Sequence, residues 1–212
     1  MAPAIRLTGM GDPPDVAYLS RGPFGDSVVS RMAERLPGRR LDDLSDLAAE
    51  PATDLVVIAL WRPARQLCWD MDDFAYEQSM AWLPVVREET AVTVGPLVVP
   101  EGPGACWHCY YRRRVTHDRQ WPATHDLHTA YDEDDTCGSD GYLPQHIRTA
   151  AALALITAAR RGDSAKPTPV VRLDLTSTKV TSDRVVGCHG CLRCGIEQPQ
   201  SGNPLSHLGR NR

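Results

Sequence analysis

Two Cys-x-x-Cys pairs constrain this chain more than any other feature of its sequence. Cys106 and Cys109 stand in the stretch GACWHCYYRRR, and Cys191 and Cys194 stand much later, in VVGCHGCLRCG. Two residues between thiolates let a tight turn direct both sulfur atoms at one tetrahedral ion. The two pairs together supply the four ligands of a closed site, so we expect one structural zinc ion. Because the pairs lie farther apart than in a compact zinc finger, the ion is expected to join two distant parts of one fold.

Other interpretations of the cysteines stay open. The second possibility is a redox-active dithiol, although such a centre needs only one Cys-x-x-Cys pair, at the start of a helix, and this chain has two. The third possibility is that the cysteines are unrelated thiols. Cys188 stands three residues before Cys191, so it can replace Cys191 or Cys194 as a ligand. We favour Cys191 and Cys194, because Gly195 directly after the pair permits the positive φ that such a turn often needs.

The remaining cysteines and the histidines are interpreted conservatively. Cys68 lies in an apolar helical stretch and is expected to be a buried thiol, whereas Cys137 lies in an acidic loop. A cluster of histidines and aspartates occupies the polar segment 117–142, where a second metal site is the alternative to solvated loop histidines. These residues are His117, Asp118, His125, Asp126 and His128. Their spacing matches no catalytic pattern such as H-E-x-x-H.

Composition excludes several classes of protein. The 212 residues are 42% hydrophobic and 24% charged, as in a soluble globular protein. The net charge of -4 argues against nucleic-acid binding, and the short run Arg112-Arg113-Arg114 does not reverse that balance. The N-terminal residues lack the apolar stretch of a signal peptide, and no window is apolar enough to span a membrane. We therefore expect a cytoplasmic protein whose cysteines hold metal or stay free.

The order of apolar patterns predicts an α/β fold. The run DLVVIALW, residues 54–61, is unbroken and typical of a parallel strand covered on both faces. Other expected extended segments are 16–19, 83–88, 90–100, 170–175 and 178–187, and expected helices are 28–38, 62–82 and 143–163, with a short acidic helical segment at 41–51. This alternation indicates a largely parallel sheet. We expect one domain over residues 1–195, with an irregular surface excursion at 117–142, a linker at 162–169 and a disordered polar tail at 196–212.

The combination of these parts resembles a known family. The resemblance is carried, in chain order, by a strand followed by GPFG and a helix, then DLVVIA with RP, then WLPV, then VGPLVVPEGPGACWHCYYRR and a distal CxxCG. With these parts the chain resembles the ThiF-like cyclodehydratase partner proteins. Those proteins belong to the biosynthesis of thiazole/oxazole-modified peptides, which are ribosomal (RiPP) natural products that include bacteriocins. The segment GPLVVPEGPGACWHC, residues 95–109, is the most specific part, and the resemblance covers roughly residues 15–195.

The resemblance implies a fold and partners. It implies a ThiF-like, ubiquitin-activating-enzyme-like Rossmann-type domain with a four-cysteine zinc staple. It also implies a ribosomal precursor peptide as one partner, a YcaO-type cyclodehydratase as another, and a homodimer. Family members capture the peptide with an N-terminal winged-helix module. We expect this chain to lack that module, because only the residues before Val16 precede the first expected strand.

The nucleotide loop near residues 20–25 departs from the phosphate-binding pattern. A G-x-G-x-x-G loop uses its glycines for a tight turn and for close backbone approach to phosphate. This chain reads LSRGPFG over 19–25, so the first glycine is missing, Pro23 removes one N–H group and Phe24 is expected to fill the space. Asp26 is expected to cap the following helix and to repel phosphate. We therefore expect no bound ATP and no catalytic or cofactor-binding residues.

Three functions remain under consideration. The first is a non-catalytic partner subunit that positions a precursor peptide or a YcaO-type enzyme. We favour this scaffold role over an enzymatic one. The second is an active ThiF-type ATP-dependent adenylyltransferase, which requires an intact phosphate loop. The third is a generic zinc-stapled interaction module. The sequence names neither the precursor peptide nor the heterocycle.

Overall fold

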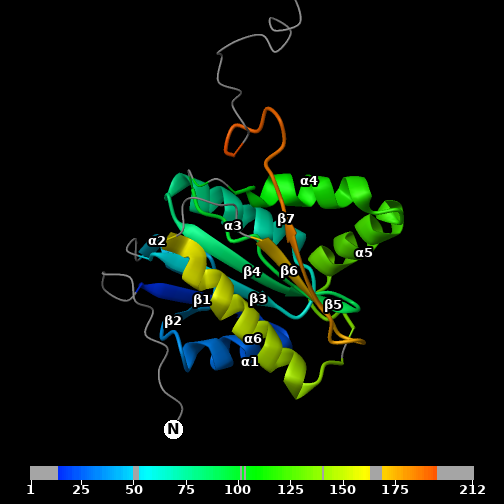
Figure 1. The fold of residues 1–212 in the computed structure, drawn as a ribbon, viewed down its shortest axis with the longest axis horizontal. Coiled ribbons are helices and arrows are strands. Elements are labelled where there is room, and N and C mark those ends of the chain that lie inside the picture. The colour runs from blue at the N-terminus through cyan, green and yellow to red at the C-terminus, as the bar shows by residue number, and fades with distance from the viewer. Residues whose placement is uncertain are drawn as a thin grey trace, which may run out of the picture.

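The chain folds around a single seven-stranded sheet with helices on both faces (Figure 1). The computed structural model describes residues 14–49, 53–100, 102, 104–139, 141–162 and 169–194. The strands are β1 (Val16–Arg21), β2 (Arg39–Leu41), β3 (Leu55–Leu60), β4 (Ala81–Arg87), β5 (Ala91–Val94), β6 (Pro169–Asp174) and β7 (Val180–Arg184). The helices are α1 (Gly22–Ala33), α2 (Ser45–Ala49), α3 (Arg65–Glu77), α4 (Trp107–His117), α5 (Trp121–Glu133) and α6 (Pro144–Ala158), the last continued by a 3-10 turn at Ala159–Gly162.

The first half of the sheet is parallel. Strand order is β2-β1-β3-β4-β5-β6-β7, and β1 pairs in parallel with both β2 and β3, while β3 pairs in parallel with β4. All six residues of β3 are buried, as the unbroken apolar run predicts for a strand covered on both faces. Because the chain moves from β1 to one side and returns to β3 on the other, the order of the strands reverses between β1 and β3.

The second half of the sheet is antiparallel, so the prediction of a largely parallel sheet is wrong there. Each of the pairs β4 with β5, β5 with β6, and β6 with β7 is antiparallel. β4 and β5 are separated by a short turn, which permits only an antiparallel neighbour, since a parallel connection needs a crossover of a dozen residues or more. The mixed α/β class that the sequence predicts is confirmed.

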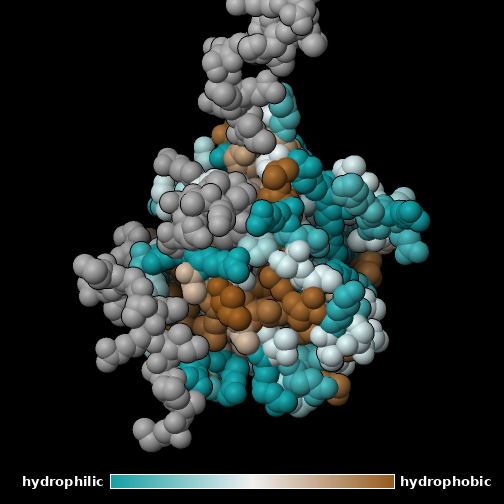
Figure 2. Space-filling view, in the orientation of Figure 1, coloured by the Kyte–Doolittle hydropathy of each residue, from teal (hydrophilic) through white to brown (hydrophobic). Residues whose placement is uncertain are grey.

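Alternate side chains of the central strands enter two separate cores. On one face Tyr18, Val57 and Val85 pack with α1 and α6. On the other face Leu19, Ile58 and Trp82 pack with α2, α3 and the first turn of α4. The face of α6 that points away from the sheet is itself apolar, and Ile156 there is exposed; Figure 2 shows apolar surface over this helix.

The polar segment after α4 is more ordered than its sequence suggests. In place of an irregular surface excursion over residues 117–142, Trp121–Glu133 form the helix α5. Pro122 lies in the first turn of α5, where its missing N–H has no helical partner to lose. The C-terminal end of α5 is held by Arg62, which donates hydrogen bonds to the carbonyl oxygens of Tyr131 and Asp134.

Some predictions fall on residues outside the described part of the chain. These are most of the linker at 162–169, the tail at 196–212, and Gly195, on which the choice of cysteine register rests. Within the described ranges, no helix is both long and apolar enough to cross a lipid bilayer.

Candidate metal centre

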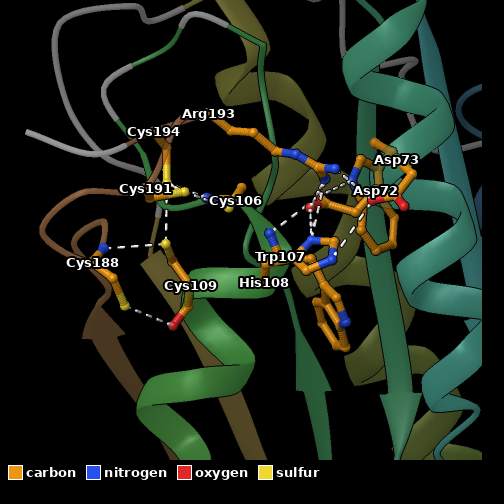
Figure 3. A network of polar contacts seen from close by, with 11 residues as sticks. Asp72, Asp73, Cys106, Trp107, His108, Cys109, Cys188, Cys191, Arg193 and Cys194 are labelled. Carbon is orange, nitrogen blue, oxygen red and sulfur yellow. Dashed lines mark hydrogen bonds and ion pairs between the residues drawn. The ribbon is translucent and has the colours of Figure 1, made fainter.

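The two Cys-x-x-Cys pairs meet in space (Figure 3). Cys106 is the N-cap residue of α4 and Cys109 lies in the first turn of that helix, whereas Cys191 and Cys194 lie in the turn that comes after β7. All four Sγ atoms lie within 4.8 Å of one another. The structure therefore brings together the four residues that the spacing predicts, from the middle of the chain and from its C-terminal part.

The spacing of the sulfur atoms fits a tetrahedral ion better than disulfides. The Sγ–Sγ distances are 3.8 Å for Cys106–Cys191, 3.5 Å for Cys109–Cys194 and 3.9 Å for Cys191–Cys194. A regular tetrahedron with Zn–S bonds of about 2.3 Å has edges of about 3.8 Å. A disulfide requires about 2.05 Å between the sulfurs, and all four cysteines are free thiols. The donor set and its dimensions therefore fit zinc.

Backbone N–H groups support the sulfur atoms. The amide of Cys106 donates to Cys194 Sγ at 3.1 Å, and the amide of Cys188 donates to Cys109 Sγ at 3.1 Å. Such bonds stabilise thiolate charge in metal knuckles. Cys188 thus contributes its backbone, while its own sulfur contacts the Cys109 carbonyl at 3.8 Å and stays outside the group of four.

Two glycines shape the second pair. Gly190 has φ +76, so the turn between Cys188 and Cys191 uses the left-handed conformation that glycine adopts without strain. Gly187 lies against Cys194, where a Cβ atom would come within 2.2 Å of the Cys194 carbonyl oxygen. Within the described residues, the glycines inside VVGCHGC therefore shape this turn, and the expectation about Gly195 stays a prediction.

The thiols of the cluster have perturbed acidities. Contact with the Cys194 thiol and burial raise the pKa of Cys106, and burial raises the pKa of Cys109 to about 12. Burial would also raise the pKa of Cys191, but backbone hydrogen bonds from Cys194 and Arg193 lower it to about 6. Four thiolates at these distances repel one another unless a cation neutralises them. The arrangement therefore favours a bound cation whenever the sulfurs are ionised.

Asp72 on α3 ties the cysteine cluster to the sheet layer (Figure 3). Its Oδ1 accepts hydrogen bonds from Trp82 Nε1 at 3.0 Å and from the Trp107 amide at 3.1 Å. Its Oδ2 lies 2.8 Å from His108 Nδ1 and 3.2 Å from Arg193 Nη1. Asp72 is 2% exposed, so a buried carboxylate connects both knuckles to the core.

Arg193 makes the second knuckle part of this network. It lies between Cys191 and Cys194, and its Nη2 also donates to Asp73 Oδ1 at 2.7 Å. Its guanidinium stacks over the Tyr76 ring at 5.1 Å. Neither Asp72 nor Arg193 is predicted from the sequence, because α3 carries several aspartates and nothing in the pattern marks the buried one.

The other predicted thiols and histidines lie apart from the cluster. Cys68 is buried on α3 as expected, and burial raises its pKa. His125 is exposed on α5, but the expectation of a solvated loop histidine is wrong for His128, which is 5% exposed on the same helix. His128 is buried because α5 turns one face towards α3 and α4, which the polar sequence does not reveal. Among the described residues, His117, His125 and His128 belong to no cluster of potential metal ligands.

The loop expected to be a damaged nucleotide site forms the start of α1. α1 begins at Gly22, whose φ is +69, and not near Asp26. The expectation that Asp26 caps the helix is wrong, because the helix has no side-chain cap and Asp26 instead accepts a hydrogen bond from Ser20 Oγ at 2.6 Å. The expectation that Phe24 fills the loop is also wrong, since Phe24 is fully buried in the core and packs edge-on against Tyr142.

Trp61 occupies the space that the sequence assigns to Phe24. Its ring lies directly on Gly22, where a Cβ atom would come within 2.3 Å of Trp61 Cδ1, and it lies equally close to Gly138. A cavity of about 630 Å³ opens beside it at the carboxyl ends of β1 and β3, lined by residues that include Arg21, Arg62 and Tyr131. Ligands of open α/β sheets bind at such a reversal of strand order.

Comparison with known proteins gives the fold. No protein-family model and no curated protein matches the sequence. The heterocyclase TruD matches with a TM-score of 0.61 and 18% identity over 86% of this chain and 27% of its own. A heterocyclase in complex with substrate and cofactor matches with a TM-score of 0.62 and 18% identity over 86% of this chain and 25% of its own. Escherichia coli MccB, described as a microcin C7 biosynthetic enzyme and solved with N-formylated MccA, matches with a TM-score of 0.59 and 14% identity over 86% of this chain and 67% of its own.

The chain therefore spans about a quarter of the length of the heterocyclases and two thirds of MccB. At these identities the comparison concerns architecture. The mixed α/β fold of this chain is the fold that is also found within the heterocyclase TruD and within MccB.

Proposed function

We propose that Cys106, Cys109, Cys191 and Cys194 bind one structural zinc ion. Support comes from the four sulfur donors, their tetrahedral spacing and the N–H groups directed at two of them. Four thiolates leave no open coordination position, so the ion supplies a cross-link and charge neutralisation. Residues of the chain hold the two cysteine pairs in place. The N-terminus of α4 stabilises the first pair, and Arg193 fixes the second pair against α3.

The variants Cys191→Ser and Cys188→Ser test this proposal as a matched pair. We expect the unmodified protein and Cys188→Ser to retain one zinc ion per chain, and Cys191→Ser to lose it, as measured by metal analysis of the purified proteins. X-ray absorption should report only sulfur neighbours at about 2.3 Å. Equal loss in both variants, or nitrogen in the coordination sphere, contradicts the assignment.

We further propose that the chain is a non-catalytic partner subunit in the biosynthesis of thiazole/oxazole-modified ribosomal peptides. In this role it positions a precursor peptide, a YcaO-type cyclodehydratase, or both. The observation that carries the proposal is the fold shared with a heterocyclase and with a microcin biosynthetic enzyme, together with the resemblance of residues 95–109 to cyclodehydratase partner proteins. A cytoplasmic location and a homodimer belong to the same proposal.

An active adenylyltransferase is the second candidate, and one observation favours it. The cavity of about 630 Å³ lies where α/β sheets bind nucleotides. Three features weigh against ATP there. The first glycine of the loop is missing, Trp61 covers Gly22, and Arg62 is engaged with the end of α5. Backbone approach to a phosphate needs the surface that Trp61 occupies.

Titration with Mg-ATP and a pyrophosphate-exchange assay separate the two candidates. The scaffold predicts no binding heat at millimolar ATP and no exchange with any peptide. Exchange that disappears in Arg21→Ala would overturn the scaffold in favour of the adenylyltransferase.

Reconstitution separates the scaffold from a generic zinc-stapled module. A purified YcaO protein and its precursor peptide are incubated with ATP, with and without this chain, and ring formation is monitored by the mass lost as water. The scaffold predicts a faster reaction or tighter peptide capture when the chain is present. No effect on either quantity with YcaO partners encoded beside this chain favours the generic module.

A further inference from the structure

A small cavity lies where α3, α4 and α5 meet, on the core side of the first knuckle. Its volume is about 20 Å³, and its lining includes Arg65, Glu88, Trp107, Tyr111 and His128. Trp107 stands between the cysteines of the first pair, so this cavity borders the proposed metal centre without sharing its ligands. A volume of about 15 Å³ on this measure is enough for one water molecule.

Four buried polar atoms of the lining residues have no hydrogen-bond partner among the described residues. They are Arg65 Nε, Trp107 Nε1, Tyr111 Oη and His128 Nδ1. Trp107 is 6% exposed and His128 is 5% exposed. The Arg65 guanidinium lies near the Tyr111 hydroxyl but outside hydrogen-bonding geometry. Buried polar groups in folded proteins are almost always paired with protein or with ordered water, so four such atoms on residues that line one cavity indicate a ligand.

The chemistry of the four atoms matches one water molecule. The indole N–H of Trp107 and the Nε–H of Arg65 can only donate hydrogen bonds. The Tyr111 oxygen and an unprotonated His128 Nδ1 can accept them. Burial lowers the pKa of His128, which favours its neutral form. A water molecule accepts two hydrogen bonds and donates two, which is the complement of this set.

The surrounding charges argue against an anion. Glu88 lines the same cavity with its buried carboxylate. The Arg65 charge is already balanced by Asp132 at 3.1 Å, and Arg114 and Arg172 pair with Glu88. An anion would therefore face the Glu88 carboxylate, and each of these arginines already has a carboxylate partner.

We propose that this cavity is an internal water-binding site that links the three helices. The bound water accepts hydrogen bonds from Trp107 and Arg65, and donates to His128 and Tyr111. It thereby connects the metal-bearing helix α4 to α3 and α5. This site gives the buried His128 imidazole a hydrogen-bond partner, and it is independent of the proposed role in peptide biosynthesis.

A crystal structure from crystals soaked in sodium bromide tests the site directly. We expect an isolated density peak within hydrogen-bond distance of Trp107 Nε1 and His128 Nδ1, with no anomalous signal at the bromide edge. An anomalous peak would show an anion site, and a cavity without density would show a dry one. Either result overturns the proposal.

The variant Tyr111→Phe tests the site in solution, with Tyr76→Phe as the control. Tyr111→Phe removes one hydroxyl and leaves the ring contacts with Trp69 and Trp121 in place. If water is bound, the change removes one of its partners and lowers the urea midpoint of unfolding. If the cavity is dry, the change removes an unpaired polar group and leaves the midpoint unchanged or raises it, which overturns the proposal. Tyr76 is 46% exposed, so its variant should unfold at the same urea concentration as the unmodified protein.

Discussion

Asp72 is the residue at which the cysteine cluster and the sheet depend on one another. Both of its oxygen atoms accept hydrogen bonds from two groups, and one of these donors, Arg193, belongs to the second knuckle. Hydrogen bonds to a charged acceptor contribute more than neutral ones. The neighbouring Asp73 binds the same arginine but is half-exposed, which makes the two aspartates a natural comparison.

We predict that Asp72→Asn lowers the free energy of unfolding by about 2–3 kcal/mol. An asparagine has the same shape, but in either orientation its NH2 group faces two donors and it loses the charge that pairs with Arg193. Asp73→Asn should cost less than about 1 kcal/mol, because an exposed ion pair is screened by solvent. Urea denaturation of both variants measures the difference, and equal effects would contradict a special role for Asp72.

Glu88 makes the stability of the folded protein depend on pH in the acidic range. Its carboxylate is 3% exposed and pairs with Arg114 of α4 and with Arg172 of β6, the latter at 2.6 Å. Burial alone would raise the pKa of Glu88, but the two guanidinium groups outweigh burial and lower it. A carboxyl group with a lowered folded pKa stabilises the protein above its unfolded pKa of about 4.3, and that stabilisation is lost as the pH falls through the folded value.

We predict that Glu88→Gln costs about 3 kcal/mol at neutral pH, because it leaves buried arginine charge unpaired. The difference in free energy of unfolding between the two proteins should begin to shrink below about pH 4.3, where the glutamate of the unfolded chain takes up a proton, and should be lost as the pH falls through the lowered pKa of the folded Glu88. Denaturation curves across this range measure the difference, and any loss of metal in acid affects both proteins alike. A difference that stays constant with pH would show that the Glu88 charge does not contribute.

Among the elements, apolar periodicity decides how much can be predicted from the sequence. Residues 54–61 and 143–158 are recognisable as strand and helix because their burial supplies most of their stability. α5 is not recognisable, because it is held by arginine donors rather than by an apolar stripe. Arg62 binds carbonyl oxygens at its end, and Arg87 binds the Gly141 carbonyl at 3.1 Å in the loop beyond it.

The residues of the candidate site also differ in how far they can be predicted from the sequence. The four cysteines are predictable because ligand spacing is a local property of the chain. Asp72, Arg193 and Trp61 are not, because their roles depend on neighbours far away in sequence, such as Trp82 for Asp72 and Gly22 for Trp61. Pairings of this kind leave no periodic pattern in a single sequence.

The role of Arg62 leads to a prediction at the scale of one helix. Arg62→Lys keeps the charge but loses the planar fork that reaches two carbonyl oxygens at once. Losing about 1.5 kcal/mol of charged hydrogen bonding should speed amide exchange in the last turn of α5 about tenfold, while β1 and β3 stay protected. Arg119→Lys, an exposed position before α5, serves as the control. Unchanged exchange in α5, or a uniform rise across the sheet, would show that Arg62 does not anchor this helix.

At the scale of the whole molecule, the cysteine cluster attaches the C-terminal part of the chain to α4, in addition to its pairing with the sheet through β7. β7 is the last strand of the sheet and all five of its residues are exposed, so its attachment rests on β6 and on the segment from Val185 to Cys194. Arg113 of α4 donates to the carbonyl oxygens of Val186 and Gly187, at 2.7 Å and 3.0 Å, and the cysteines lie directly beyond. The C-terminal part of the fold therefore rests on α4 as well as on the sheet edge.

Metal removal should consequently act on the stability of the whole domain. An ion that binds only the folded chain stabilises it by RT ln(1 + [Zn]/Kd), about 4 kcal/mol when free zinc exceeds Kd roughly 1,000-fold. We predict that a chelator lowers the thermal midpoint and that the midpoint rises again with the logarithm of free zinc. Cys188→Ser should keep this dependence and Cys191→Ser should lack it.

Amide exchange identifies how far the effect of the metal extends. Trp107 packs on Trp82 and its amide binds Asp72, so the first knuckle is joined directly to the sheet and to α3. Release of the metal should therefore weaken protection in α3 and β4 as well as in β7, because metal binding and folding are coupled. A thermal midpoint that is indifferent to zinc, or protection lost only beyond residue 180, would mean that the cluster stabilises its own loop and not the fold.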